Sequence, residues 1–199
     1  MPLSTPSTAG PLTGTLVDTV YRIGPVLARG GMATVYLAEE RTLRRPVALK
    51  VPSRETLESQ DGGARLLIEA EHASRLRGHR TAAVLEVGHL PDGTPFMVTE
   101  LLTGRDLRTV LEQDGPQNVL QATLYAIGAG RALEAVHATG VVHGDASLSN
   151  FMACPTPSGE EVRVVDFGAS YLAGEPYVQR PVSASPSAVA PEVLRQRGG

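Results

Sequence analysis

The sequence predicts an α+β protein whose first half is rich in strands and whose second half is mainly helical. Up to Leu102, short apolar runs alternate with polar residues and are separated by turns that contain Gly, Pro or Asp. Beyond Gly104, longer periodic stretches without such turns predict helices. The 199 residues suffice for one domain or for two small lobes with a sizeable core.

Composition and charge exclude several classes of protein. Hydrophobic residues make up 42% and charged residues 20%, as in a folded globular chain, and no apolar run approaches the ~20 residues that span a bilayer. The net charge of −3 argues against a nucleic-acid partner. One cysteine, Cys154, excludes an internal disulfide framework, and no Cys/His spacing suggests zinc. The first residues lack a secretory signal, so we expect a cytoplasmic protein without a membrane partner.

The first fifty residues predict a leader and three strands. Residues 1–18 are rich in Ser, Thr, Pro and Gly without periodicity, which predicts a flexible leader. From Val20 to Leu37, two apolar runs flank a Gly-Gly turn, which predicts a strand hairpin. Residues 45–51 predict a third strand, because every second residue from Val47 is a large aliphatic one.

The next elements are one helix and two further strands. Residues 59–76 predict a helix, because leucine and alanine recur at a spacing near 3.6. Residues 82–88 and 95–102 predict two strands, which the turn Pro91-Asp92-Gly93 separates.

The second half predicts two helices followed by a pair of strands. A short helix is predicted over 106–113, and Asn118 is suited to cap a longer helix that ends near His137. Short strands are predicted around Phe151 and over 162–167, joined by a loop over 154–161.

Lys50 is the only lysine beside seventeen arginines. A compact ammonium and a planar guanidinium are not interchangeable where one small cation must reach one spot. Lys50 follows the hairpin that carries Gly30 and Gly31, and the backbone N–H groups of such turns approach phosphate oxygens closely. Glu69, on the predicted helix, is placed to pair with Lys50.

Three motifs follow in the second half: His143-Gly-Asp with Asn150 five residues after the Asp, Asp166-Phe-Gly, and Ala190-Pro-Glu. Asp145 and Asn150 suit one group that orients a hydroxyl and one that holds a metal, and Asp166 adds a hard oxygen ligand for Mg²⁺. Each motif is weak alone, but their order and spacing together are a strong signal.

The motifs resemble those of the eukaryotic-like protein kinase family, particularly the bacterial Ser/Thr kinases, from about Tyr21 to Leu194. The resemblance implies a two-lobe, protein-kinase-like fold: a leader over 1–18, a strand-rich N-lobe with one helix over 19–101, and a truncated helical C-lobe over 102–199 that ends after Ala190-Pro-Glu. It implies an enzyme that transfers the γ-phosphate of Mg-ATP to a protein hydroxyl.

The resemblance also implies roles for single residues. Asp145 is similar to the catalytic Asp, Lys50 to the lysine on the α- and β-phosphates, and Asn150 and Asp166 to the Mg²⁺ ligands. Gly30 and Gly31 are expected to cover the phosphates of ATP, Val35 and Ala48 to enclose its adenine, and Glu69 to hold the lysine. Glu100 and Leu102 resemble the hinge that hydrogen-bonds adenine, next to Thr99 at the gatekeeper position. Leu27 is a further expected contact of ATP.

The sequence departs from the family at several positions. Ala28 and Ala33 replace two glycines of the phosphate loop. Gly144 replaces the Arg that pairs with an activation-loop phosphate, and Ser147 stands where Ser/Thr kinases place a Lys. The sequence printed here ends at Gly199, before the later helices of the family's C-lobe.

These departures leave alternatives open. The pattern also resembles small-molecule phosphotransferases of the aminoglycoside and choline type, and the atypical kinases of tRNA threonylcarbamoylation. A third alternative is a pseudokinase or scaffold that binds nucleotide without transfer. The short C-lobe further predicts self-association, or a partner that covers the apolar helix around Leu120 to Val136.

Overall fold

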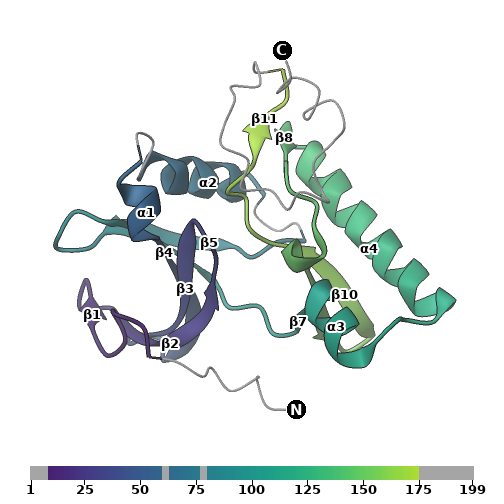
Figure 1. Cartoon of the computed structure of the whole chain (residues 1–199), viewed down its shortest axis with the longest axis horizontal. Coiled ribbons are helices and arrows are strands. Elements are labelled where there is room, and N and C mark those ends of the chain that lie inside the picture. Colours follow the sequence, from purple (N-terminus) through teal and green to yellow (C-terminus); the bar gives the residue numbers. More distant parts are fainter. Residues whose placement is uncertain (1–8, 60–62, 77–79, 175–199) are drawn as a thin grey trace. The chain divides into compact units, whose positions relative to one another are not determined.

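The computed structural model of the chain describes residues 9–59, 63–76 and 80–174 (Figure 1). They divide into two compact units, each described here by itself. The first unit contains the described residues up to Ser74 together with Ala82–Leu101, and the second contains those of Arg75–Thr81 and those from Leu102 onward.

The first unit is built on one six-stranded antiparallel sheet in the order β1-β2-β3-β4-β6-β5. Its strands are β1 (Leu16–Val17), β2 (Tyr21–Arg29), β3 (Ala33–Glu40), β4 (Arg45–Pro52), β5 (Val84–His89) and β6 (Pro95–Glu100). The unit also holds the short helix α1 (Arg54–Leu57) and helix α2 (Ala64–Ser74). The five strands predicted from the sequence are confirmed, whereas α1 was not predicted and α2 begins later than the predicted residue 59.

One face of this sheet forms the core. Val47, Leu49 and Val51 of β4 are buried and pack with residues of β2, β3 and β6, as the alternation in the sequence predicts. The sheet curls until Tyr21 of β2 donates its hydroxyl to Glu86 of β5 at 2.5 Å, although three strands separate them in the sheet order. Burial and the Glu86 carboxylate raise the pKa of Tyr21, so the phenol keeps the proton it donates.

The segment 9–18 was expected to belong to a flexible leader, and its structure differs from that expectation. The Gly14 N–H donates to the Ile23 carbonyl at 2.8 Å, and Leu16–Val17 pair with β2. A Cβ on Gly10 would lie 2.6 Å from the ring of Tyr36, so the missing side chain lets this segment pack closely against β3. Thr and Gly here serve turns and close contacts within the first unit.

The second unit combines two helices with two small sheets. Its helices are α3 (Leu107–Asp114) and α4 (Val119–His137), and its described residues also contain the 3₁₀ turn η1 (Leu148–Asn150). One sheet has the order β10-β9-β7 and the other pairs β11 with β8. Their strands are β7 (Arg105–Asp106), β8 (Val141–Val142), β9 (Phe151–Thr156), β10 (Gly159–Val164) and β11 (Tyr171–Leu172).

Helix α4 begins where the sequence predicts. The side chain of Asn118 accepts the Gln121 N–H at 2.9 Å and caps the helix, which runs to His137 as expected. Figure 1 shows α4 lying along β10. A Cβ on Gly128 would come within 2.7 Å of the Val162 side chain, so this glycine allows the helix and strand to approach closely.

The loop predicted over 154–161 is wrong. β9 and β10 pair in register up to Thr156 and Gly159, and only Pro157 and Ser158 remain as the turn. β7 pairs with β9 only at Met152 and Ala153, so Pro155 lies where β9 has one neighbour, and there a missing N–H is tolerated. Within the described part of the chain, no helix has the length and apolar character needed to cross a membrane.

Candidate active site

The first unit places four of the predicted nucleotide contacts on one face of its sheet. Val35 of β3, Lys50 of β4 and Met97 of β6 lie directly opposite one another in register. One step along, Ala48 of β4 lies opposite Thr99 of β6. Residues opposite each other share a face, and the alternate residues of these strands point into the core. Val35, Ala48, Lys50 and Thr99 therefore form a half-buried surface on the outer face.

Helix α2 packs on the same face and supplies the partner of Lys50. Leu66 and Ala70 pack against Met97, the register neighbour of Lys50. Glu69 lies between them on that side of the helix, and its Oε1 is 2.6 Å from Lys50 Nζ. The two side chains are only 14% and 6% exposed. The ion pair expected from the sequence is present.

The Gly-containing turn is tied to the start of α1. The Gly31 carbonyl accepts the Ser53 hydroxyl at 2.9 Å, and the Met32 carbonyl accepts the Ser53 N–H at 2.7 Å. A Cβ on Gly31 would meet nothing within 4 Å, and one on Gly30 would meet only the Ala33 carbonyl at 3.7 Å. The turn is thus held at its carbonyls, with open space beside its glycines. The sequence motifs give no sign of this role of Ser53.

The other predicted nucleotide contacts lie at the ends of strands. Leu27 of β2 is 40% exposed, and Glu100 is the exposed last residue of β6, where its N–H donates to the Ala83 carbonyl at 2.8 Å. Leu102 belongs to the second unit.

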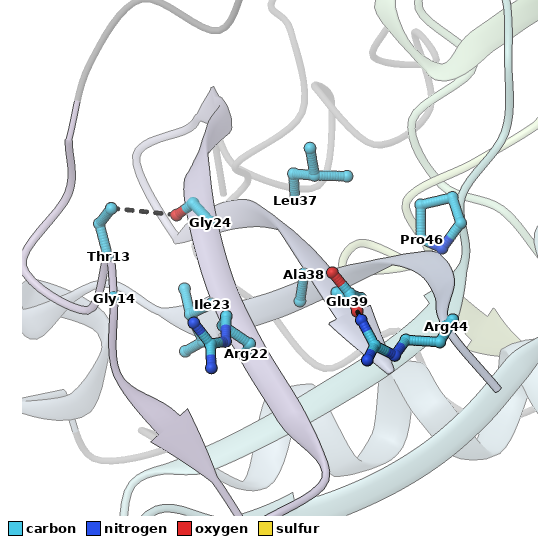
Figure 2. Close-up of a pocket in the computed structure, with 10 residues that line it drawn as sticks. All are labelled: Thr13, Gly14, Arg22, Ile23, Gly24, Leu37, Ala38, Glu39, Arg44 and Pro46. Atoms are coloured by element: carbon cyan, nitrogen blue, oxygen red, sulfur yellow. Dashed lines mark hydrogen bonds and ion pairs between the residues drawn. The ribbon is translucent and has the colours of Figure 1, made fainter. Parts of the chain in front are cut away.

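The first unit also carries a cavity of about 420 Å³ beside β2 and β3 (Figure 2). Leu37, the register partner of Ala48, lines it together with Gly24 and Pro46, and Arg44 pairs with Glu39 at 3.7 Å beside them. Its lining includes none of the residues predicted to hold ATP.

In the second unit, Asn150 holds the main chain and the carboxylate of Asp145. Its amide donates to the Asp145 carbonyl at 3.0 Å and to Asp145 Oδ2 at 3.1 Å. The other carboxylate oxygen, Oδ1, is buried and accepts no hydrogen bond within the described structure. A buried acceptor without a hydrogen-bond donor lowers the stability of the fold. Such an oxygen is available to accept a hydrogen bond from a substrate.

His143 packs beneath this loop. It is 1% exposed, its Nε2 lies 3.1 Å from the Val165 carbonyl, and its Nδ1 accepts the Asp145 N–H at 3.3 Å. Because Nδ1 is the acceptor, Nε2 carries the proton and the ring is neutral. Burial lowers the pKa of His143, which preserves this arrangement. The ring also meets Phe167 edge-on at 5.0 Å.

Asp166 is held beside the loop in a strained backbone conformation. Its φ is 63°, a left-handed value that non-glycine residues adopt rarely and that clusters at functional sites. The Val165 N–H donates to the Asn150 carbonyl at 2.9 Å on one side, and the Ser170 hydroxyl donates to the Phe167 carbonyl at 2.5 Å on the other. The unit thus brings Asp145, Asn150 and the Asp166 segment together.

Gly144 explains one departure from the kinase pattern. Its φ is +81°, and a Cβ there would lie 2.3 Å from the Ala169 carbonyl oxygen. An arginine at this position would force the loop away from the segment after Asp166. Ser147, at the position of the family's lysine, is buried and precedes η1.

The residues fit a magnesium ion that arrives with a nucleotide. Within the described ranges no group of three or more His, Cys, Asp or Glu side chains gathers as a metal site. Mg²⁺ commonly takes one or two protein oxygens and completes its shell with phosphates and water, so the Asp166 carboxylate and the Asn150 amide oxygen suffice.

Comparison with known proteins agrees with this arrangement. Residues 21–199 match the family model described as the protein kinase domain. Among curated relatives, the chain is 32% identical to the serine/threonine-protein kinase pkn3 of Myxococcus xanthus over 153 residues, which cover 76% of this chain and 28% of that protein. It is 35% identical to PknK of Mycobacterium tuberculosis over 179 residues, covering 89% and 15%, and 32% identical to PknB of Mycobacterium leprae over 151 residues, covering 74% and 24%.

The chain belongs to the protein kinase family, and its α+β fold is the one the resemblance implied. It is similar to bacterial Ser/Thr kinases and spans less than a third of the length of these relatives. The Ala190-Pro-Glu motif lies outside the described residues.

The buried ion pair should respond to mutation as a unit. Lys50→Met removes the cation that pairs with the buried Glu69 carboxylate, so we expect the free energy of unfolding to fall by about 3 kcal/mol. Lys50→Met combined with Glu69→Leu should recover most of that loss. Denaturant unfolding measures both, and Arg54→Met, which breaks an exposed pair with Glu58, is the control expected to change little. Equal losses in the single and double variants contradict a coupled pair.

Gly144 and Gly140 form a matched pair for testing the close approach at Ala169. Both have φ near +80°, but a Cβ on Gly140 meets nothing within 4 Å. Gly140→Ala should cost about 1 kcal/mol for the left-handed backbone alone. Gly144→Ala must also displace the Ala169 carbonyl, so its free energy of unfolding should fall further. Equal losses in denaturant unfolding would show that the approach carries no cost.

Proposed function

We propose that the chain is an ATP-dependent Ser/Thr protein kinase that transfers the γ-phosphate of Mg-ATP to a protein hydroxyl. The observation that carries the proposal is Asp145, whose carboxylate is fixed through one oxygen by Asn150 and keeps the other oxygen buried without a donor. The ion pair of the only lysine and membership of the kinase family support the same conclusion.

The first unit binds and orients the nucleotide in this proposal. Lys50, held by Glu69, contacts the α- and β-phosphates, and the turn with Gly30 and Gly31 covers the phosphates. Leu27, Val35, Ala48 and Thr99 enclose the adenine, and the hinge residues Glu100 and Leu102 hydrogen-bond it. Of these residues only Leu102 belongs to the second unit.

The second unit holds the reacting groups. Asp145 Oδ1 accepts the hydrogen bond of the attacking hydroxyl and orients it toward the γ-phosphate. Asn150 and Asp166 hold Mg²⁺, which neutralises charge on the phosphates when it is bound. Ser147 supplies no cation there, and loss of one such charge typically costs about 10²–10³ in rate at comparable sites. The proposed kinase is therefore slow.

Two measurements test the proposal. Mg-ATP at a hundredfold excess over its dissociation constant should stabilise the chain by roughly 2.7 kcal/mol, seen as a rise in melting temperature that Lys50→Met reduces. With labelled ATP and a generic protein substrate, label should appear on protein and disappear in Asp145→Asn and Asp166→Asn. Full turnover in Asp145→Asn contradicts the catalytic assignment.

The alternatives give different outcomes in the same assays. ATP turnover that requires a small alcohol and leaves proteins unlabelled supports a small-molecule kinase. The observation that favours this alternative is Ser147, which stands where Ser/Thr kinases have a lysine. A thermal shift without any turnover supports a pseudokinase or scaffold.

We further propose that the exposed side of α4 is a contact surface for a second copy of the chain. Leu120, Leu124 and Ile127 recur at helical spacing and are 71%, 52% and 47% exposed, and contiguous apolar surface of this kind marks interfaces.

Replacement of Leu120 and Leu124 by Lys should shift the chain toward monomer in sedimentation velocity over a range of concentrations. Leu43→Lys, at an equally exposed leucine of the first unit, is the control and should leave association unchanged. A wild-type chain that stays a stable monomer from low to high concentration contradicts this contact.

A further inference from the structure

Arg108 is tied to the loop that carries the proposed catalytic groups. It lies exposed on α3, and its Nε donates to the Ser149 hydroxyl at 2.9 Å. Ser149 directly precedes Asn150, the residue that holds the Asp145 carboxylate. The guanidinium is therefore fixed one residue away from the amide that organises the site.

The terminal nitrogens of Arg108 keep their binding capacity within the described structure. In the same unit, Arg105 donates through both terminal nitrogens to Asp114 at 2.8 and 2.6 Å, which neutralises it. Arg108 takes part in no such ion pair among the described residues, and its bond to Ser149 uses Nε only. The two terminal nitrogens of an arginine form a fork that matches the oxygens of a carboxylate or phosphate.

The loop itself supplies no competing charge close to Ser149. Residues 146–150 read Ala-Ser-Leu-Ser-Asn, so Asp145 is the nearest charged residue on that stretch of chain. Leu148, the neighbour of Ser149, is 42% exposed and gives the surface an apolar contact beside the cation. A substrate segment whose hydroxyl reaches Asp145 has to pass close to this part of the loop.

We propose that Arg108 is a specificity-determining residue that binds an anionic side chain of the protein substrate near the phosphorylated Ser or Thr. The inference rests on the proposed kinase function and names its substrate class: segments that carry a Glu, an Asp or an already phosphorylated residue beside the acceptor.

Peptides with a single acceptor Ser test the inference. One set carries Glu beside the Ser, one carries phosphothreonine, one Gln and one Lys. The wild-type chain with Mg-ATP should show a kcat/KM about tenfold higher for the anionic peptides than for the Gln peptide, the size expected of one charge-assisted contact, and lowest for the Lys peptide. A preference for phosphothreonine over Glu identifies phosphate as the ligand, and equal preference identifies anionic charge.

Three variants separate specificity from structure. Arg108→Gln should bring the ratio of Glu to Gln peptides to about one, whereas Arg131→Gln, at an exposed arginine of α4, should keep the wild-type ratio. Ser149→Glu should also abolish the ratio, because the new carboxylate pairs with Arg108 while α3 and η1 stay linked. A rate loss of the same size on every peptide in Arg108→Gln means that Arg108 only supports the loop, and it overturns the inference.

The outcomes also distinguish the inference from the proposed function. Transfer to peptides with a flat ratio in the wild-type chain overturns the inference alone. No transfer to any peptide or protein overturns the proposed function, and the inference with it.

Discussion

The ion pair between Lys50 and Glu69 is the interaction on which the first unit depends. It joins a strand in the middle of the sheet to the helix that covers the outer face, so the register of β4 and the position of α2 are fixed together. Two buried charges are expensive to desolvate and stabilise the fold only when they stay paired. The pair therefore keeps a cation poised on the face that also carries Val35, Ala48 and Thr99.

In the second unit, hydrogen bonds to the backbone and left-handed backbone conformations hold the candidate site in place. His143 contacts the Val165 carbonyl through Nε2. Asn150 holds the Asp145 carboxylate, and its carbonyl accepts the Val165 N–H. Hydrogen bonds on both sides of its segment therefore hold Asp166 at its left-handed φ. Gly144 permits the close approach to Ala169. This glycine stands where the family has the arginine that pairs with an activation-loop phosphate. We therefore expect this chain to be regulated without that contact.

Local chemistry made much of the fold predictable. The alternation of buried and half-buried residues in β4 and the Asn118 cap of α4 depend only on residues close in sequence, and the structure has both. The segment 9–18 and the hairpin of β9 and β10 were misjudged because contacts distant in sequence override a loop-like composition. Gly10 approaches Tyr36 in the first case, and Gly128 of α4 approaches Val162 of β10 in the second. In the site, residue types and spacing identified Lys50, while the unsatisfied Asp145 Oδ1 and the Arg108–Ser149 bond depend on folded geometry that no motif records.

The proposed function assigns the phosphates of a Mg-nucleotide to Lys50, and its metal ion to Asn150 and Asp166. A crystal structure of the chain with Mg²⁺ and a non-hydrolysable ATP analogue tests this most directly. We expect Lys50 Nζ on the α- and β-phosphate oxygens while it still pairs with Glu69, and Mg²⁺ bound by Asn150 and Asp166. Phosphates that contact neither Lys50 nor the Asn150 and Asp166 pair would contradict it.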